Sequence, residues 1–238
     1  TAVGSQAMQI NTIGSGNTAV GGAALYANTT GINNTAIGNG TLANNITGSH
    51  NVALGSGALI GATADNNIAI GNNAGSNITT GSGNIYIDAN APIGTESTTT
   101  RIGTAQTSAF IAGIRGVATG IANAIPVLID SAGQLGTISS TRRVKHDIQD
   151  MKNVSANIYD LRPVTFIYNG DTSETRQHGL IAEEVDAVFP ELVIYDKDGL
   201  PYTVRYEVLP VLLLNELQKQ QGRFDLIERR LQYIESHL

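Results

Sequence analysis

A short motif recurs through the first hundred residues at steps of 17, 17, 16 and 17 residues, and this period limits the fold more than any other feature. Each full copy has Asn first, a small or aromatic residue third and an aliphatic residue fourth. Repeats of this length are typical of solenoids, in which stacked coils bury one continuous core. The copies are residues 17–21, 34–38, 51–55, 67–71 and 84–88, and residues 1–4 fit the same register.

A coil of this length has a contour of about 56 Å at roughly 3.3 Å per residue, which accommodates two short strands and their turns. A second apolar column and a column of glycines recur further along each repeat. We therefore predict a parallel β-solenoid, or β-roll, over residues 1–100, with two short strands in every coil. The second apolar column is Met8, Leu25, Leu42 and Leu59, and the glycines are Gly14, Gly31, Gly48 and Gly81.

The third and fourth motif positions are both apolar, and neighbouring strand positions point to opposite faces. A single coil has only one interior, so we expect the other face to pack on further copies of the chain. The sequence leaves open which column faces inward. The third position holds Ala2, Ala19, Ala36, Ala53, Ala69 and Tyr86, and the fourth holds Val3, Val20, Ile37, Leu54, Ile70 and Ile87.

Composition narrows the function classes. Residues 1–100 contain only three of the 34 charged side chains but 17 of the 27 glycines, so this half cannot have an ordinary core of large residues. The net charge of −6 excludes a generally basic protein that coats nucleic acid. The absence of cysteine excludes disulfides and thiolate metal sites. No apolar run approaches the roughly 18 to 20 residues of a membrane span, so we expect no membrane insertion.

The repeats resemble the head repeats of trimeric autotransporter adhesins, although the coils of that family are usually shorter. The resemblance implies left-handed parallel β-rolls assembled as trimers, and it assigns no ligand. A flexible Gly/Asn/Ser linker is disfavoured by the regular aliphatic columns. An ice-binding face would need a sustained Thr ladder, but the second position changes from Thr1, Thr18 and Thr35 to Val52, Ile68 and Ile85.

The remaining chain is expected to hold a connector and an α+β region. Residues 101–139 suggest short strands at 110–116 and 126–130 broken by glycine turns, with a tight turn at 130–133. Beyond them we predict a helix-length segment at 147–161, a strand at 163–168, a strand end entering a short helix at 179–190, and a hairpin at 191–206 whose turn is 196–199.

The tail, residues 211–238, has the spacing of a coiled-coil helix, because two series of apolar residues interleave at steps of three and four. A parallel trimer of such helices would agree with the self-association expected of the solenoid, although aliphatic seams alone do not separate trimers from dimers. Gln220 is the polar member of the pattern. The apolar positions are Leu213, Leu217, Phe224, Ile227, Leu231, Ile234 and Leu238.

Four segments closely resemble the endosialidase-type intramolecular chaperone domain of phage tailspikes and fibres, which also occurs in a membrane-tethered transcription factor. They are residues 140–145 (STRRVK), 161–163 (LRP), 179–185 (GLIAEEV) and 189–192 (FPEL). The resemblance covers residues 140–238 and implies a domain that trimerises, assists folding of the preceding β-fibre and cuts itself off. It implies that Ser140 is the nucleophile, Lys145 the base and Ser139–Ser140 the scissile bond.

The chemistry of this pair can be considered without the family. A lysine can take a proton from a serine only as the neutral amine, which the positive charges of Arg142 and Arg143 and a nearby helix N-terminus favour. A five-residue step on a helix turns about 140° net, and on a strand it reverses the face, so a turn or a neighbouring subunit must join the pair. We hypothesise that cleavage waits for trimer assembly. The plain alternative is that Ser140 is a helix N-cap and Lys145 a solvated charge.

Other candidate residues are weaker. His178 could support the serine or simply lie exposed in a polar loop. Glu183 and Glu184 diverge by about 100° on a helix and are not expected to act as an acid–base pair. Asp196 and Asp198 lack the following Glu of a calcium loop. We therefore expect no metal and no cofactor.

The sequence thus predicts a homotrimeric fibre or adhesin on a virion or a bacterial surface, with a β-roll at 1–100, a β connector at 101–139 and a self-releasing chaperone domain at 140–238. The alternative is a permanent, non-cleaving trimerisation cap of a surface adhesin. An enzyme acting on glycans fits poorly, because residues 1–100 hold no clustered carboxylate pair. We expect the chain to be the C-terminal part of a longer protein, and any host or surface receptor to bind the region that precedes it.

Overall fold

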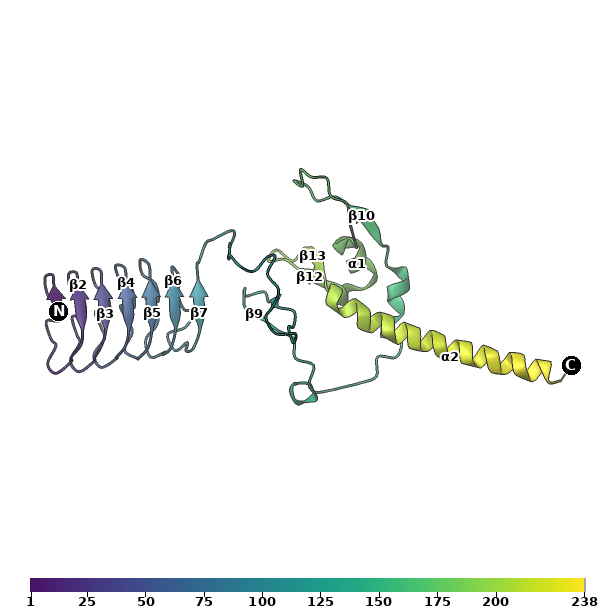
Figure 1. Cartoon of the computed structure of the whole chain (residues 1–238), viewed down its shortest axis with the longest axis horizontal. Helices are drawn as coiled ribbons and strands as arrows, with labels where there is room; N and C mark the ends of the chain where they lie inside the picture. The colour runs from purple at the N-terminus through teal and green to yellow at the C-terminus, as the bar shows by residue number, and fades with distance from the viewer. Residues whose placement is uncertain (238) are drawn as a thin grey trace. The chain divides into compact units, whose positions relative to one another are not determined.

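The computed structural model describes residues 1–237, which divide into two compact units, Thr1–Gly120 and Ile121–Leu238. The first unit is a parallel β-solenoid with a period of about 17 residues, as predicted. Its seven strands lie side by side in chain order (Figure 1). They are β1 (Ala2–Val3), β2 (Thr18–Val20), β3 (Thr35–Ile37), β4 (Val52–Leu54), β5 (Ile68–Ile70), β6 (Ile85–Ile87) and β7 (Thr100–Ile102). The sheet therefore continues two residues past the expected limit at 100.

The strands of the sheet pair so that equivalent positions of the sequence motif lie opposite each other. Ala19 pairs with Ala36, and Ala36 with Ala53, so the third motif position forms one column across the sheet. This column faces the interior, where Ala19, Ala36 and Ala53 are fully buried. The fourth position faces outward, and Leu54 keeps 45% of its surface exposed. The column that faces inward is therefore the column of small residues at the third motif position.

Each coil contains one strand, so the prediction of a second strand was wrong. The expected second column is buried, but Leu25, Leu42 and Leu59 have φ values of 50°, 52° and 50° in the left-handed region, which a strand cannot include. Backbone hydrogen bonds between coils continue here, since Leu25 N–H donates to the Thr41 carbonyl at 3.0 Å. The apolar spacing alone therefore identified a buried column without giving its backbone conformation.

Glycine ends most motif copies because the backbone there is both left-handed and closely packed. Gly21 has a φ of 133°, and a Cβ atom on it would lie 2.4 Å from the carbonyl oxygen of Gly38 in the next coil. Any larger residue would push the coils apart.

The first residue of each motif forms a buried ladder of asparagines through the solenoid. The Oδ1 atom of Asn34 accepts from the backbone N–H of Asn51 at 3.0 Å and from its Nδ2 at 3.1 Å. The Nδ2 of Asn34 donates to the Gly48 carbonyl at 2.8 Å and to Asn17 Oδ1 at 3.2 Å. Each asparagine therefore satisfies backbone groups in a turn that no strand partner reaches. The ladder is Asn17, Asn34, Asn51, Asn67 and Asn84.

The inward column ends in a charged group rather than another alanine. Tyr86 replaces Ala in β6, and Arg101 follows it in β7. The Tyr86 hydroxyl donates to Glu96 Oε2 at 3.0 Å, and Arg101 Nε donates to the same oxygen at 2.9 Å. The hydrogen bond from Arg101 lowers the pKa of Glu96, and burial together with the bond to Glu96 raises the pKa of Tyr86. This triad closes the open end of the alanine column.

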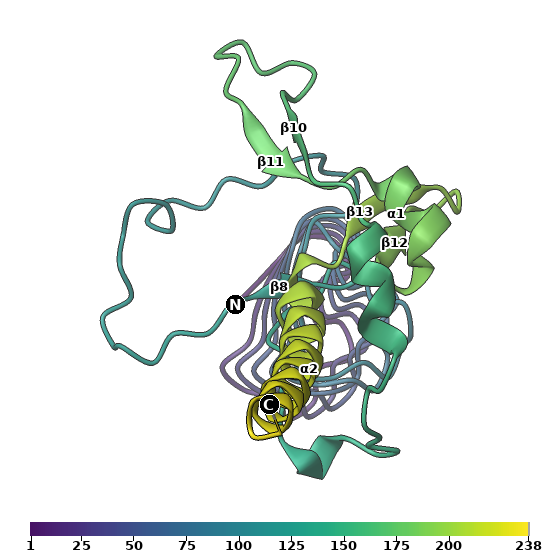
Figure 2. The same cartoon turned by 90° about the vertical axis from the view of Figure 1, so that its right-hand side faces the viewer.

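The second unit is a small α+β region that ends in a long helix (Figure 2). The hairpin β12–β13 turns at 196–199 as predicted, and the short helix before Pro190 is also confirmed. The elements are β8 (Leu128–Ile129), β9 (Leu135–Gly136), η1 (Arg142–Val144), η2 (Val154–Asp160), β10 (Val164–Phe166), β11 (Gln177–Gly179), α1 (Ala182–Val188), η3 (Pro190–Leu192), β12 (Val193–Tyr195), β13 (Pro201–Val204), η4 (Tyr206–Val208) and α2 (Leu209–Glu235).

Two predicted elements differ in the structure. The helix expected at 147–161 is only the 3₁₀ turn η2, because Asp147 and Lys152 have φ values of 49° and 48°, which an α-helix cannot include. The strand expected at 110–116 does not form, and its side chains, such as Phe110, are exposed. The core of the unit instead gathers α1, the β12–β13 hairpin and the start of α2, with Val185, Phe189, Leu192, Val193, Val204 and Leu212 buried.

We predict that Asn34→Ala lowers the unfolding free energy of the solenoid by about 2–4 kcal/mol, because the Asn51 N–H and the Gly48 carbonyl lose their buried partner. Urea denaturation followed by circular dichroism at fixed protein concentration measures this change. The matched control is Asn44→Ala at an exposed position, which should cost less than about 0.5 kcal/mol. Equal stability of the two variants would contradict a supporting role for the ladder.

We also predict that acid weakens the end of the solenoid. Because the folded pKa of Glu96 is lowered, its contribution is present above its ordinary value of 4.5 and is lost as pH falls through the folded value. Glu96→Gln should therefore be less stable than wild type at neutral pH, and the difference should shrink on acidification. Thermal melts across pH measure this, with the exposed Glu183→Gln as the control. A difference that stays constant with pH would rule out the carboxylate as its source.

Candidate functional site

Ser140 and Lys145 flank a tight turn in the second unit. Thr141 begins the 3₁₀ turn η1, and its Oγ1 accepts from the Arg143 backbone N–H at 3.4 Å. The Lys145 N–H donates to the Arg142 carbonyl at 3.2 Å, which closes the turn at its other end. A 3₁₀ turn of three residues thus reverses the chain between the two predicted functional residues.

This turn brings the two side chains into contact. Lys145 Nζ donates to Ser140 Oγ at 3.1 Å. Of the two routes open from sequence, a turn or a neighbouring subunit, the turn within one chain suffices for this contact. The N-cap role considered for Ser140 belongs to Thr141 instead, so the Ser140 hydroxyl has Lys145 as its partner. A hydroxyl and an amine at hydrogen-bond distance can exchange a proton when the amine is neutral.

The surroundings of this pair are open to water in the single chain. Ser140, Lys145, Arg142 and Arg143 are all exposed. Arg143 Nε reaches the Thr141 hydroxyl at 3.3 Å, so Arg143 reinforces the cap of the turn. Solvent stabilises a charged lysine, whereas a low-dielectric setting disfavours it. Lys145 Nζ and Ser140 Oγ are therefore close enough for proton transfer. The pair lacks the dry environment that would favour a neutral amine.

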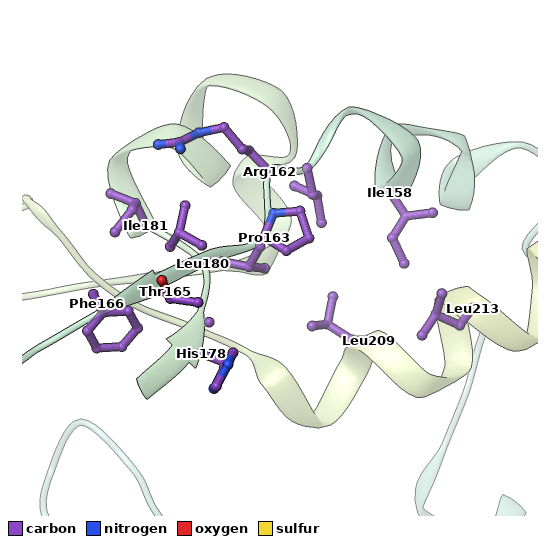
Figure 3. A pocket seen from close by; sticks show the side chains of 13 residues that line it. Ile158, Arg162, Pro163, Thr165, Phe166, His178, Leu180, Ile181, Leu209 and Leu213 are labelled. Atoms are coloured by element: carbon purple, nitrogen blue, oxygen red, sulfur yellow. The ribbon is translucent and has the colours of Figure 1, made fainter. Parts of the chain in front are cut away.

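His178, the other predicted supporting residue, lies on β11 opposite Thr165 of β10. Its side chain is exposed, and no hydrogen bond within residues 1–237 links it to Ser140 or Lys145. It borders an open, mostly apolar groove of about 1070 Å³. Figure 3 shows Ile158 of η2 across from Leu209 and Leu213 of α2 in this groove. His178 therefore borders the groove, and among the described residues no hydrogen bond or ion pair couples it to the serine.

Two of the acidic residues set aside in the sequence, Glu184 and Asp196, have structural partners. Glu184 forms an ion pair with Arg162, which lowers the pKa of Glu184. Asp196 Oδ1 accepts from the backbone N–H of Asp198 at 2.8 Å and so holds the β12–β13 turn. Glu183 is exposed on α1.

A buried polar cluster, which sequence reasoning missed, fixes α2 against η2. The Ser155 hydroxyl donates to Glu216 Oε1 at 2.5 Å, and Asn215 Nδ2 donates to Ser155 Oγ at 2.5 Å. Lys219 Nζ donates to Glu216 Oε1 at 2.7 Å and, with Ser155, lowers the pKa of this carboxyl. The i, i+3 spacing of Glu216 and Lys219 was the available signal, but their partner Ser155 lies 61 residues from Glu216.

The predicted apolar coiled-coil positions of α2 are largely exposed. Leu217 keeps 61% of its surface exposed, and Phe224 keeps 60%. Leu212 and Glu216 are the buried residues of the helix. We call the exposed apolar row the seam. Its described members are Leu213, Leu217, Phe224, Ile227, Leu231 and Ile234, and the predicted seam residue Leu238 lies outside the described residues.

Comparison with known proteins identifies the segment that contains the turn. Residues 140–194 match the family model described as chaperone of endosialidase. Over these residues the chain is similar to that family. The match begins at Ser140 and ends within the hairpin strand β12, so it covers part of the 140–238 span on which the sequence resemblance rests. No curated protein matches the chain.

Within residues 1–237, no helix is both long and apolar enough to cross a membrane. The same residues contain no group of three or more His, Asp or Glu side chains arranged to hold a metal ion.

We predict that Ser155→Ala loosens α2 from η2 and lowers stability by about 1–3 kcal/mol, because Glu216 and Asn215 lose a buried partner. Thermal melting followed by the helical signal measures this. Ser173→Ala in the exposed β10–β11 loop is the control and should change little. Identical melting of both variants would show that the cluster contributes nothing.

Proposed function

We propose that this chain belongs to a trimeric fibre or adhesin, in which residues 140–238 act as an endosialidase-chaperone domain that drives trimerisation and folding of the preceding β-solenoid and then releases itself by one cut between Ser139 and Ser140. The domain would act once, as an intramolecular serine endopeptidase. It would work on a virion fibre or a bacterial cell surface. The order of the chain, a β-solenoid followed by a segment similar to the endosialidase-chaperone family, supports this role.

The contact of 3.1 Å between Lys145 Nζ and Ser140 Oγ, at the first residue of the family match, carries the proposal. A neutral Lys145 amine takes the Ser140 hydroxyl proton while Oγ attacks the carbonyl carbon of Ser139. The carbon–nitrogen bond between Ser139 and Ser140 then breaks, and the proton passes from Lys145 to the departing Ser140 amine. The product is an ester between Ser139 and Oγ. Water hydrolyses it to a Ser139 carboxylate and a free Ser140 hydroxyl.

Trimer assembly would supply the dry environment that the exposed pair lacks. Two surfaces in the chain favour association: the seam on α2, and the outward aliphatic column of the solenoid, where Leu54 and Ile70 remain 45% and 41% exposed. The groove beside His178 includes the seam residue Leu213, so partners on the seam would approach this groove. If the assembly also excluded water from the Ser140–Lys145 pair, it would favour the neutral amine and so couple cleavage to completed folding.

A specific observation favours the runner-up function. In a single chain both members of the pair are exposed, as ordinary surface residues are. If assembly leaves them exposed, the domain would act as a permanent trimerisation cap of a surface adhesin and would not cut.

We predict that the wild-type chain yields fragments of 139 and 99 residues on denaturing gels, and that Ser140→Ala and Lys145→Ala abolish both fragments. Mass spectrometry of the larger fragment should end it at Ser139. Ser131→Ala and Lys197→Ala, which change the same residue types at exposed turns, should cut normally. Wild type that stays intact alongside both variants would refute self-cleavage and favour the permanent cap.

We further predict that the cleavage rate rises with protein concentration until the chain is fully assembled. A seam variant such as Leu231→Asp should remain both dissociated and uncut, because a buried charge in the seam opposes association. Sedimentation and gel analysis of the same samples measure assembly and cleavage together. Complete cleavage by a dilute, monomeric chain would show that assembly is unnecessary.

A further inference from the structure

The two edges of the seam carry opposite charges. In heptad notation Leu217, Phe224 and Leu231 are a positions. Two arginines beside them fall at g, and two glutamates fall at e. The g positions are Arg223 and Arg230, and the e positions are Glu228 and Glu235. Of the other charged residues in this stretch, Asp225 and Arg229 lie on the outer face at b and f.

None of these four edge residues has a charged partner among the described residues of its own chain. All four are exposed, and within residues 1–237 none takes part in an ion pair. The preceding heptad differs, because its g residue, Glu216, is buried against η2 and paired with Lys219. The free charges therefore begin where the contacts of α2 with η2 end.

We propose that the seam selects two further copies of this chain, aligned parallel and in register, through ion pairs from Arg223 to Glu228 and from Arg230 to Glu235 of the neighbouring copy. In parallel coiled coils a g residue faces the e residue five positions later on the next helix, and both spacings here are five. In an antiparallel arrangement like edges meet, which would set Arg against Arg and Glu against Glu. The charges thus exclude the antiparallel partner that the apolar seam alone would accept.

Gln220 fixes the register of the same interface. It is the polar d residue, half-buried, and its Nε2 donates to the Tyr159 hydroxyl of η2 at 2.8 Å. In register, the Gln220 side chains of all copies share one layer, each held by its own Tyr159. A slip of one heptad would set each amide against Leu213 or Ile227 of a neighbour, and a polar group buried against apolar side chains is costly.

This inference rests on the trimer proposed above and is tested in the Ser140→Ala chain, so that cleavage cannot alter the assembly measured. Three variants are compared with that parent by sedimentation over a range of concentrations. The acidic variant carries R223E and R230E, the basic variant carries E228R and E235R, and the swapped variant carries all four changes.

We expect the acidic and basic variants each to assemble roughly tenfold more weakly than the parent, because like charges meet along every edge. The swapped variant should assemble as the parent does, because it restores every pair with the sign reversed. Equal assembly of all four chains, or a swapped variant as weak as the acidic one, would overturn the proposal. A parent that stays monomeric would instead refute the trimer itself.

Partner choice provides a second readout. The acidic and basic variants are given different tags and refolded together, and the tags in each trimer are counted. Mixed trimers should exceed the fraction found when two tagged parent chains are mixed, because mixing removes most like-charge contacts. Mixing no greater than that of the parent chains would show that the edge charges do not choose the partner.

Discussion

Hydrogen bonding from one coil to the next is the interaction on which the first unit depends. Alanines make up most of its core, beside the buried column of Leu25, Leu42 and Leu59, and each alanine side chain buries little apolar surface. The Asn17–Asn84 ladder and the backbone bonds between coils satisfy the polar groups that this narrow interior would otherwise strand. Stacking is therefore both the fold and its stabilisation, and the Tyr86–Glu96–Arg101 triad closes the end where stacking stops.

The second unit, in contrast to the solenoid, leaves a large part of its apolar surface uncovered. Its core gathers around Val185, Phe189 and Leu212, whereas the α2 seam, the groove and the connector side chains stay exposed. The polar cluster at Ser155 and Glu216 fixes α2 against η2, whereas the apolar seam residues stay largely exposed. If copies assemble along the seam, α2 would couple that assembly to the part of the chain that contains the Ser140–Lys145 turn. This is the coupling that a chaperone which cuts only after folding would need.

Much of the solenoid could be predicted because its signal is repeated. Six copies of one motif fixed the period, the parallel register and the fold class, since each coil has to bury what its neighbours bury. The same repetition did not reveal the left-handed backbone at Leu25, because side-chain spacing says which residues are buried and not which dihedral angles bury them. The helix expected at 147–161 failed for a related reason: residues that suit a helix in composition are held at Asp147 and Lys152 in a conformation no α-helix contains.

For the candidate site, the sequence alone determined the residue types, their spacing of five and the resemblance that singled out Ser140 and Lys145. It also determined the heptads of the tail and the charges beside them. Only the tertiary structure decided that a 3₁₀ turn joins the pair within one chain, that Thr141 takes the cap, and that the alanine column faces inward. The physical reason is that chain spacing restricts which groups can meet, whereas hydrogen bonds and burial in three dimensions decide which of them do.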